Sequence, residues 1–145
     1  MFLGKYSHSF DSKGRLIIPA KFREEVDGQK LVVVPWWEED LTVFPEQAFK
    51  EYIESLNGLQ GSAEKIRRIK RFLLSNAESA KLDAQGRILV GQDLRKFAKL
   101  DKDVIITGNM TYFEIWNPET WAKVEEKLND AEEMRSELES LKMML

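Results

Sequence analysis

The stretch "DSKGRLIIP" at residues 11–19 returns 72 positions later as "DAQGRILVG" at residues 83–91. The similarity continues without a gap through the apolar segments 32–34 and 104–106, and both halves then reach a Pro-Glu pair. A similarity sustained over about 35 residues indicates an internal duplication rather than a chance match of one motif. The chain should therefore contain two copies of one small unit.

Each copy predicts a strand, a tight Asp-x-x-Gly-Arg turn, a second strand, a short helix and a β-hairpin. Gly14 and Gly86 can supply the positive φ that such a turn needs, and the side chains of Asp11 and Asp83 can accept hydrogen bonds from backbone amides across it. One such unit is too small to bury a core by itself. We therefore expect an α+β fold in which both units share one barrel.

Further helices are expected between and after the two units. The apolar spacing predicts helices over 45–56 and 62–77, the first stopped near Gly58 and the second capped by Ser62. From Trp121 to Leu145, apolar residues recur every three or four positions, which predicts one helix of about 25 residues and roughly 40 Å. Its apolar seam could pack on its own domain, on the middle helices or on another subunit.

These elements divide the chain into four segments. They are a first unit (1–49), a helical linker with a basic face (50–76), a second unit (77–120) and an acidic amphipathic helix (121–145). The two units are expected to form a single structural domain.

Composition excludes several classes of protein. There are no cysteines, and hydrophobic residues make up 43% of the chain. The longest apolar run, residues 31–37, is far too short for a membrane span. The N-terminus lacks the apolar core of a secretory signal, so we expect a cytoplasmic protein with no membrane partner.

The net charge of −3 is unevenly distributed. From Glu119 to the C-terminus there are eight acidic and four basic residues, so the rest of the chain is slightly basic. Because the local potential steers association, a weakly acidic total is compatible with DNA binding.

The sequence offers little for catalysis. His8 is the only histidine, and the chain has no Gly-rich phosphate-binding motif. Asp11 and Asp83 could in principle ligate a divalent metal. Each turn supplies only one carboxylate, however, which is few ligands for a metal site, so a turn-forming role is favoured. We expect no enzyme activity, no cofactor, no metal and no small-molecule substrate.

The two motif arginines are more informative. Arg15 and Arg87 each follow a glycine turn and open a strand, where a rigid scaffold can present a long side chain. Guanidinium groups read guanine edges bidentately and neutralise phosphates. Structural ion pairs with acidic residues explain the two arginines about equally well. Further basic residues surround the motifs: Lys5, Lys13, Lys21, Arg23, Lys81 and Arg95.

Two other features have ordinary explanations. The basic residues between Lys65 and Arg71 lie on one face of a predicted helix, and such a face is most often simply solvated. Trp36 and Trp37 could stack on bases, but a tryptophan pair in a hairpin is more often core or interface.

Three stretches together resemble one known family. They are "GKYSHSFDSKGRLIIPAKFR" (4–23), "AESAKLDAQGRILVGQDLRKFAKL" (77–100) and "GNMTYFEIW" (108–116). The chain is similar to the MraZ family of bacterial transcriptional regulators over essentially its whole length. Two Asp-x-x-Gly-Arg motifs at this spacing, each followed by its own helix and hairpin, make the resemblance specific.

The resemblance implies a fold and a function. It implies two SpoVT-AbrB-type units paired as a duplicated swapped-hairpin β-barrel, and a homo-oligomeric ring. It also implies nucleoid-associated binding to direct repeats in the promoter of the division and cell-wall gene cluster, including the protein's own gene. The residues expected to contact double-stranded DNA are Arg15, Arg87, Lys13, Gln85 and Lys5.

The two copies of the motif differ at two positions, and these differences indicate which turn is the better candidate for DNA contact. Gly91 stands where the first copy has Pro19, and Gln85 where it has Lys13. If only one turn contacts DNA, we expect the more basic first turn. The alternatives are an AbrB-type antitoxin or protein-interaction scaffold, whose acidic C-terminal helix neutralises a partner, and a metal-dependent enzyme using the two aspartates.

Overall fold

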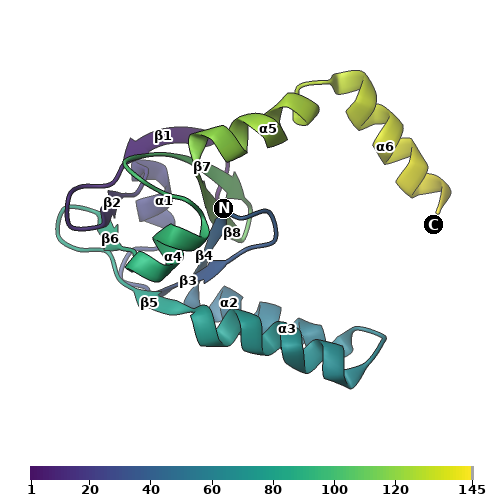
Figure 1. Cartoon of the computed structure of the whole chain (residues 1–145), viewed down its shortest axis with the longest axis horizontal. Coiled ribbons are helices and arrows are strands. Elements are labelled where there is room, and N and C mark those ends of the chain that lie inside the picture. The colour runs from purple at the N-terminus through teal and green to yellow at the C-terminus, as the bar shows by residue number, and fades with distance from the viewer. Residues whose placement is uncertain (145) are drawn as a thin grey trace.

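The computed structural model describes residues 1–144, and its elements run twice through the same order (Figure 1). The first half contains β1 Lys5–Ser9, β2 Arg15–Ile17, α1 Ala20–Glu25, β3 Leu31–Pro35, β4 Leu41–Pro45, α2 Glu46–Ser55, the 3-10 turn η1 Leu56–Gly58 and α3 Ala63–Asn76. The second half contains β5 Glu78–Ala80, β6 Arg87–Leu89, α4 Gln92–Phe97, β7 Asp103–Asn109, β8 Tyr112–Trp116, α5 Pro118–Leu128 and α6 Ala131–Met143. The expected α+β class is confirmed.

The strands form two antiparallel sheets in which the halves of the chain are interleaved. The larger sheet has the strand order β1-β7-β8-β4-β3-β5, and the smaller sheet pairs β2 with β6. The first strand of each half thus pairs with the hairpin of the other half, β1 with β7 and β5 with β3. Because neither half completes its own sheet, the two halves must fold together.

The main hydrophobic core lies between these sheets and includes Phe22 from α1 and Leu94 from α4. The inward-facing residues of the β2–β6 ribbon and the residues that follow it are almost fully buried: Leu16, Ile18, Ile88 and Val90. Burying these side chains fixes which face of the ribbon points outward. Both Asp-x-x-Gly-Arg turns consequently lie at one end of the molecule, at the left of Figure 1.

The start of the short helix differs between the two halves. In the first half Pro19 precedes α1, and proline has no backbone N–H that needs an acceptor. In the second half Gly91 precedes α4, and its N–H donates to Glu78 Oε1 at 2.8 Å. The Glu78 carboxylate on β5 therefore accepts the hydrogen bond of the Gly91 N–H, a donor that proline lacks at the corresponding position of the first half.

Helices α2 and α3 cover the outer face of β3 and β4 with a second hydrophobic cluster. Its buried residues are Val32, Val34, Trp36, Phe44, Phe49, Leu56 and Leu73. The predicted cap is confirmed, because the Ser62 side chain accepts from Lys65 N. The predicted end of the first middle helix near Gly58 also agrees with the structure, since α2 passes into η1, which ends at Gly58.

The prediction of one C-terminal helix of about 25 residues is wrong. The structure has two helices, α5 and α6, separated at Asn129 and Asp130. The Asp130 side chain accepts hydrogen bonds from Glu132 N and Glu133 N, so it starts a new helix where the old one ends. Leu145, the last residue of the predicted seam, lies outside the described residues. Within residues 1–144 no helix is both long and apolar enough to cross a membrane.

Candidate nucleic-acid interface

The two Asp-x-x-Gly-Arg turns have the same backbone geometry. Gly14 and Gly86 both have a φ of 77°, which favours glycine. Asp11 Oδ1 accepts from the backbone N–H groups of Lys13 and Arg15, each at 2.9 Å. The second turn repeats these bonds, since Asp83 Oδ1 accepts from the corresponding amides at 2.9 Å. Each turn is therefore tied together by one carboxylate.

These hydrogen bonds keep both carboxylates ionised. The backbone N–H of Arg15 is the largest cause that lowers the pKa of Asp11, to about 2. The backbone N–H of Arg87 likewise lowers the pKa of Asp83. At neutral pH both turns therefore present a negative carboxylate to the arginine that follows.

Each motif arginine pairs with the aspartate of its own turn. Arg15 Nε lies 2.7 Å from Asp11 Oδ2, and Arg87 Nε lies 2.9 Å from Asp83 Oδ2. The expected alternative of structural ion pairs is therefore present, although the pairs are not buried. The arginine side chains keep 33% and 23% of their surface exposed, so neither guanidinium is sealed off from a ligand.

The two guanidinium groups differ in how firmly they are held. Arg87 Nη1 lies 3.6 Å from Asp11 Oδ2 of the other turn, and Arg87 Nη2 donates to Gln85 Oε1 at 3.3 Å. Within the described residues neither terminal nitrogen of Arg15 donates a hydrogen bond. Arg15 is thus oriented through Nε alone and has both terminal nitrogens available.

The β2–β6 ribbon brings both arginines onto one outward face. Arg15 pairs with Leu89 and Ile17 pairs with Arg87, so two arginines alternate with two apolar residues. Ile17 is 42% exposed and Leu89 is 60% exposed. Sequence reasoning missed these two residues, because each lies within an unbroken apolar run and only the strand's period of two sets it outward.

Each turn is also packed against the other half of the chain. The N–H of Val90 donates to Gly14 O, and the N–H of Ile18 donates to Gly86 O, both at 3.0 Å. A Cβ added at Gly86 would lie 2.2 Å from Arg23 Nη1 of α1. The structure therefore places Arg23 against the turn of the opposite half, a role that its place in the basic surround did not suggest.

The reciprocal contact is looser. A Cβ at Gly14 would lie 3.1 Å from Nη2 of Arg95 in α4, whose Nε donates to Val90 O at 3.0 Å. Arg23 and Arg95 are themselves 72 residues apart, so their shared offset in the repeat was the available signal. In both halves a helix arginine supports the turn that presents a motif arginine.

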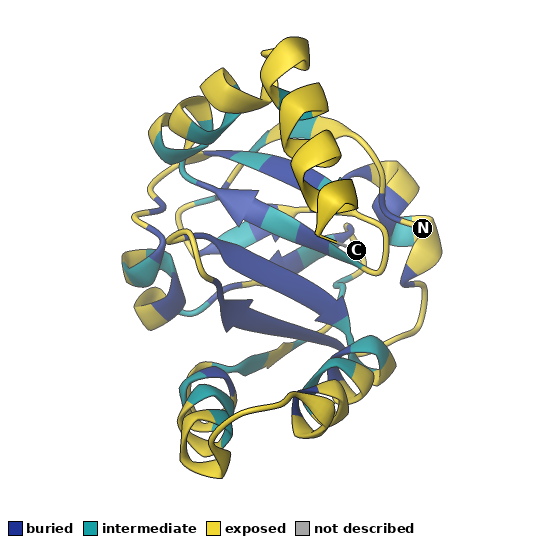
Figure 2. Ribbon diagram, turned by 90° about the vertical axis from the view of Figure 1, so that its right-hand side faces the viewer, coloured by how far each residue is buried: buried dark blue, intermediate teal, exposed yellow. Residues whose placement is uncertain are grey.

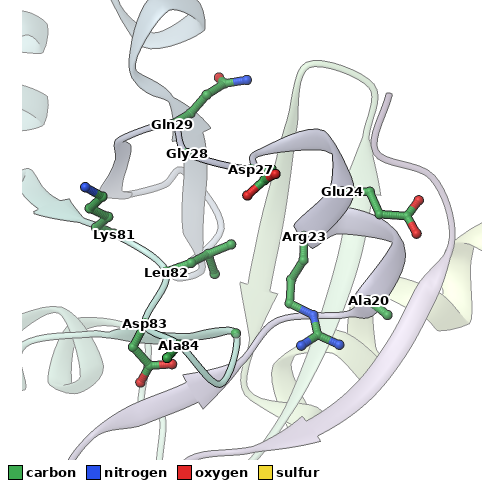
Figure 3. A pocket seen from close by; sticks show the side chains of 11 residues that line it. Ala20, Arg23, Glu24, Asp27, Gly28, Gln29, Lys81, Leu82, Asp83 and Ala84 are labelled. Carbon is green, nitrogen blue, oxygen red and sulfur yellow. The ribbon is translucent and has the colours of Figure 1, made fainter.

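An open hollow of about 720 Å³ adjoins the second turn. Figure 3 shows Arg23 reaching from α1 toward the segment that carries Asp83 and Ala84. Lys81 adds a second positive charge, but Glu24, Asp27 and Asp83 also line the hollow. Because its charges are mixed, the hollow is a poor binding site for an isolated phosphate.

The other three residues predicted to contact DNA do not all lie near the motif arginines. Lys13 and Gln85 are exposed within the turns. Lys5 lies at the opposite end of β1 and pairs with Glu125 of α5. The structure therefore groups four of the five predicted DNA contacts and places Lys5 apart from them.

A pair of acidic side chains lies away from the turns, on the outer face of the large sheet. Asp40 precedes β4 and is fully buried, while Glu114 of β8 is partly buried beside Thr42. Burial is the largest cause that raises the pKa of Glu114, to about 8, and proximity to Asp40 raises it further. Burial also raises the pKa of Asp40. A proton held by Glu114 at neutral pH lets that carboxyl donate to Asp40.

This pair predicts that stability decreases as pH rises. Glu114 binds a proton more tightly in the folded chain than in the unfolded chain, so its contribution is full below its unfolded pKa and is lost as pH rises through about 8. Between pH 5 and pH 9 we expect the free energy of unfolding to fall by about 1–3 kcal/mol from this source. Glu114→Gln should flatten the profile in urea denaturation, whereas Glu126→Gln, at an exposed position on α5, should leave it unchanged. A wild-type profile that rises from pH 5 to pH 9 would contradict the assignment.

Among residues 1–144 there is no group of three or more His, Asp or Glu side chains that could hold a metal ion. Asp11 and Asp83, the predicted candidates for such a role, are both bound to arginine.

Comparison with known proteins gives a consistent result. The family model described as "MraZ protein, putative antitoxin-like" matches residues 1–72 and again residues 73–142. A "Transcriptional regulator MraZ" from Leuconostoc citreum is 44% identical over 121 residues, covering 83% of this chain and 84% of that protein. The protein of that name from Moorella thermoacetica is 41% identical over 137 residues, covering 94% and 95%. The double match has the same 72-residue offset as the sequence repeat.

Proposed function

This chain belongs to the MraZ family of transcriptional regulators, and we propose that it binds DNA in a sequence-specific manner through its two Asp-x-x-Gly-Arg turns. The observation that carries the proposal is the outward face of the β2–β6 ribbon, which holds both Arg15 and Arg87, diagonally across the ribbon and each opposite an apolar residue. A two-stranded ribbon fits the major groove of B-DNA, and arginine is the side chain that most often reads guanine there.

The local chemistry of the face supports base contacts as well as phosphate contacts. Arg15 is oriented by Asp11 and retains free terminal nitrogens, which suits a bidentate contact. Ile17 and Leu89 are exposed between the arginines, where they can contact thymine methyl groups. Lys13 and Gln85 flank the arginines on the turns, and Lys5 would contribute only through long-range charge because it pairs with Glu125.

The units of the proposed regulator are the two SpoVT-AbrB-like segments 1–49 and 77–120, joined by the linker 50–76 and followed by 121–145. The interleaved pairing of β1 with β7 and of β5 with β3 supports a duplicated swapped-hairpin barrel. Such a barrel holds both turns on one rigid scaffold, which lowers the conformational cost of binding.

We further propose that several copies act together on direct repeats in the promoter of the division and cell-wall gene cluster, including the protein's own gene. One chain offers only a few DNA contacts, so binding to a single repeat should be weak and sensitive to salt. A homo-oligomer that contacts adjacent repeats gains affinity through high effective concentration.

A footprint of the full chain on the DNA upstream of its own gene tests this proposal. We expect evenly spaced protected segments that share a sequence, and an affinity that falls steeply as salt rises. Shuffling the shared sequence while keeping its base composition is the control. Equal binding to the shuffled and natural DNA would reject sequence-specific regulation.

A further inference from the structure

The hollow of about 720 Å³ beside the second turn is lined by charged side chains that have no partner of opposite charge. Arg23 and Lys81 supply two positive groups, and Glu24 and Asp27 supply two negative groups. Within residues 1–144 none of these four side chains forms an ion pair. Asp83 also lines the hollow, but it is already paired within its own turn. The hollow therefore offers a ligand two positive and two negative groups.

Arg23 is the group in the hollow best suited to bind an anion. Its side chain is half-buried, and its guanidinium lies against Gly86 of the second turn. Among the described residues it donates no side-chain hydrogen bond, whereas Nε of its repeat counterpart Arg95 donates to Val90 O at 3.0 Å. A guanidinium held in place with unused donors favours a planar carboxylate as its acceptor.

The acidic side chains of the hollow decide what else the ligand must carry. Glu24 and Asp27 repel a phosphate or a dicarboxylate, but they attract an ammonium group. Figure 3 shows Glu24 and Lys81 at opposite margins of the hollow, with Asp27 and Arg23 between them. A ligand that joins one carboxylate to one ammonium group matches this mixture of charges, whereas a simple anion or cation does not.

The hollow also has an apolar contact surface and room for a small molecule. Leu82 lies in it and packs on the main hydrophobic core from the other side. Gly28 keeps one wall open, because a Cβ added there would meet no atom within 4 Å. The volume lies within the range of about 300–1,000 Å³ that is usual for small-molecule sites.

This charge pattern is not a general property of the repeated unit. At the offset of 72 residues, Glu24 and Asp27 correspond to Lys96 and Lys99 of the second half. The acidic side of the hollow therefore belongs to the second turn alone, and the equivalent positions near the first turn are basic.

We propose that the hollow binds a small zwitterion, namely a free amino acid or a short peptide with an apolar side chain. The ligand carboxylate accepts from Arg23, the ammonium group lies against Asp27, and the apolar side chain contacts Leu82. The ligand thereby bridges α1 of the first half and the segment 81–84 of the second half.

The bridge gives the ligand an influence on DNA binding, and this part rests on the proposed function. Segment 81–84 contains Asp83, whose carboxylate shapes the turn and pairs with Arg87. A ligand that restricts this segment lowers the conformational cost of binding DNA. The ligand therefore raises the affinity for DNA, and DNA raises the affinity for the ligand by the same factor.

Thermal unfolding of the full chain without DNA tests the site, with glycyl-leucine and leucine as probes. At least one probe at 10 mM should raise Tm by about 3–5 °C, as expected for a dissociation constant on the order of 1 mM. Glycyl-leucinamide lacks the carboxylate and should bind about tenfold more weakly. N-acetyl-glycyl-leucine lacks the ammonium group and should bind about two- to fivefold more weakly. No shift with either probe, or equal shifts with the capped compounds, would reject the site.

A pair of matched variants locates the site on the chain. Asp27→Asn should weaken binding of the probe about two- to fivefold, because it removes the partner of the ammonium group. Asp101→Asn is the control, since Asp101 is an exposed acid outside the hollow. Arg23→Gln should abolish the shift in Tm, measured against the variant's own Tm without ligand. If Asp27→Asn and Arg23→Gln respond to the probe like Asp101→Asn, the ligand does not bind in this hollow.

A DNA titration separates this inference from the proposed function. At constant salt, saturating glycyl-leucine should raise the affinity for one DNA repeat about two- to tenfold, and glycyl-leucinamide at the same concentration should not. An unchanged affinity would reject the regulatory role of the site. If the chain binds no DNA but Tm shifts as expected, the site stands and the proposed function fails.

Discussion

Arg15→Ala should weaken binding to one DNA repeat by about 5- to 150-fold, because a bidentate base contact contributes about 1–3 kcal/mol. The effect should be larger on adjacent repeats, since each chain of the oligomer loses the same contact. The measurement is a titration by fluorescence anisotropy at fixed salt, first with one repeat and then with several.

Arg87→Ala should have a smaller effect than Arg15→Ala. The Arg87 guanidinium is already engaged by Asp83, Asp11 and Gln85, whereas Arg15 is held through Nε alone. Contacting a base would require Arg87 to give up some of these partners.

Two variants control the arginine experiment. Arg15→Lys keeps the charge but loses the planar fork, so it should retain phosphate contact and lose sequence preference. Lys50→Ala removes an exposed cation on α2 and should change affinity by less than about twofold. If both motif variants bind like wild type while remaining folded, the turns do not contact DNA.

Gly86→Ala should lower the free energy of unfolding by roughly 2–4 kcal/mol. The added methyl group meets a positive φ of 77° and would also lie 2.2 Å from Arg23 Nη1 and 2.5 Å from Arg23 Cδ. Because the collision involves the stem of the arginine as well as its tip, the whole side chain must move. Thermal unfolding should show a decrease of roughly 5–15 °C in Tm.

Other glycines of the same chain separate the two causes. Gly28 has a φ of 71° with no atom near its would-be Cβ, so Gly28→Ala should show the backbone cost alone, about 1 kcal/mol. Gly58 has neither the positive φ nor a close neighbour, so Gly58→Ala should be nearly neutral. If Gly86→Ala is no worse than Gly28→Ala, the packing of Arg23 against the turn contributes little.

What could be predicted about the fold depended on local patterns. The hairpins, the middle helices and the Ser62 cap follow from periodicity and capping within a few residues. The break in the C-terminal helix also has a local cause, because the Asp130 side chain caps the amides of Glu132 and Glu133 two and three residues later. The apolar spacing continues across this break, so the spacing predicted one helix. Periodicity alone does not reveal a break that leaves the apolar spacing intact.

The amino-acid sequence by itself determined the two turns, because the groups that shape each one lie within five residues: the aspartate, the glycine and the arginine amide. Only the tertiary structure decided which residues share the outward face of the ribbon, since β2 and β6 meet across 72 positions. It also decided that Arg23 supports the opposite turn and that Asp40 meets Glu114. Such contacts depend on how the two halves interleave, and burial of a shared core fixes that arrangement over the whole chain.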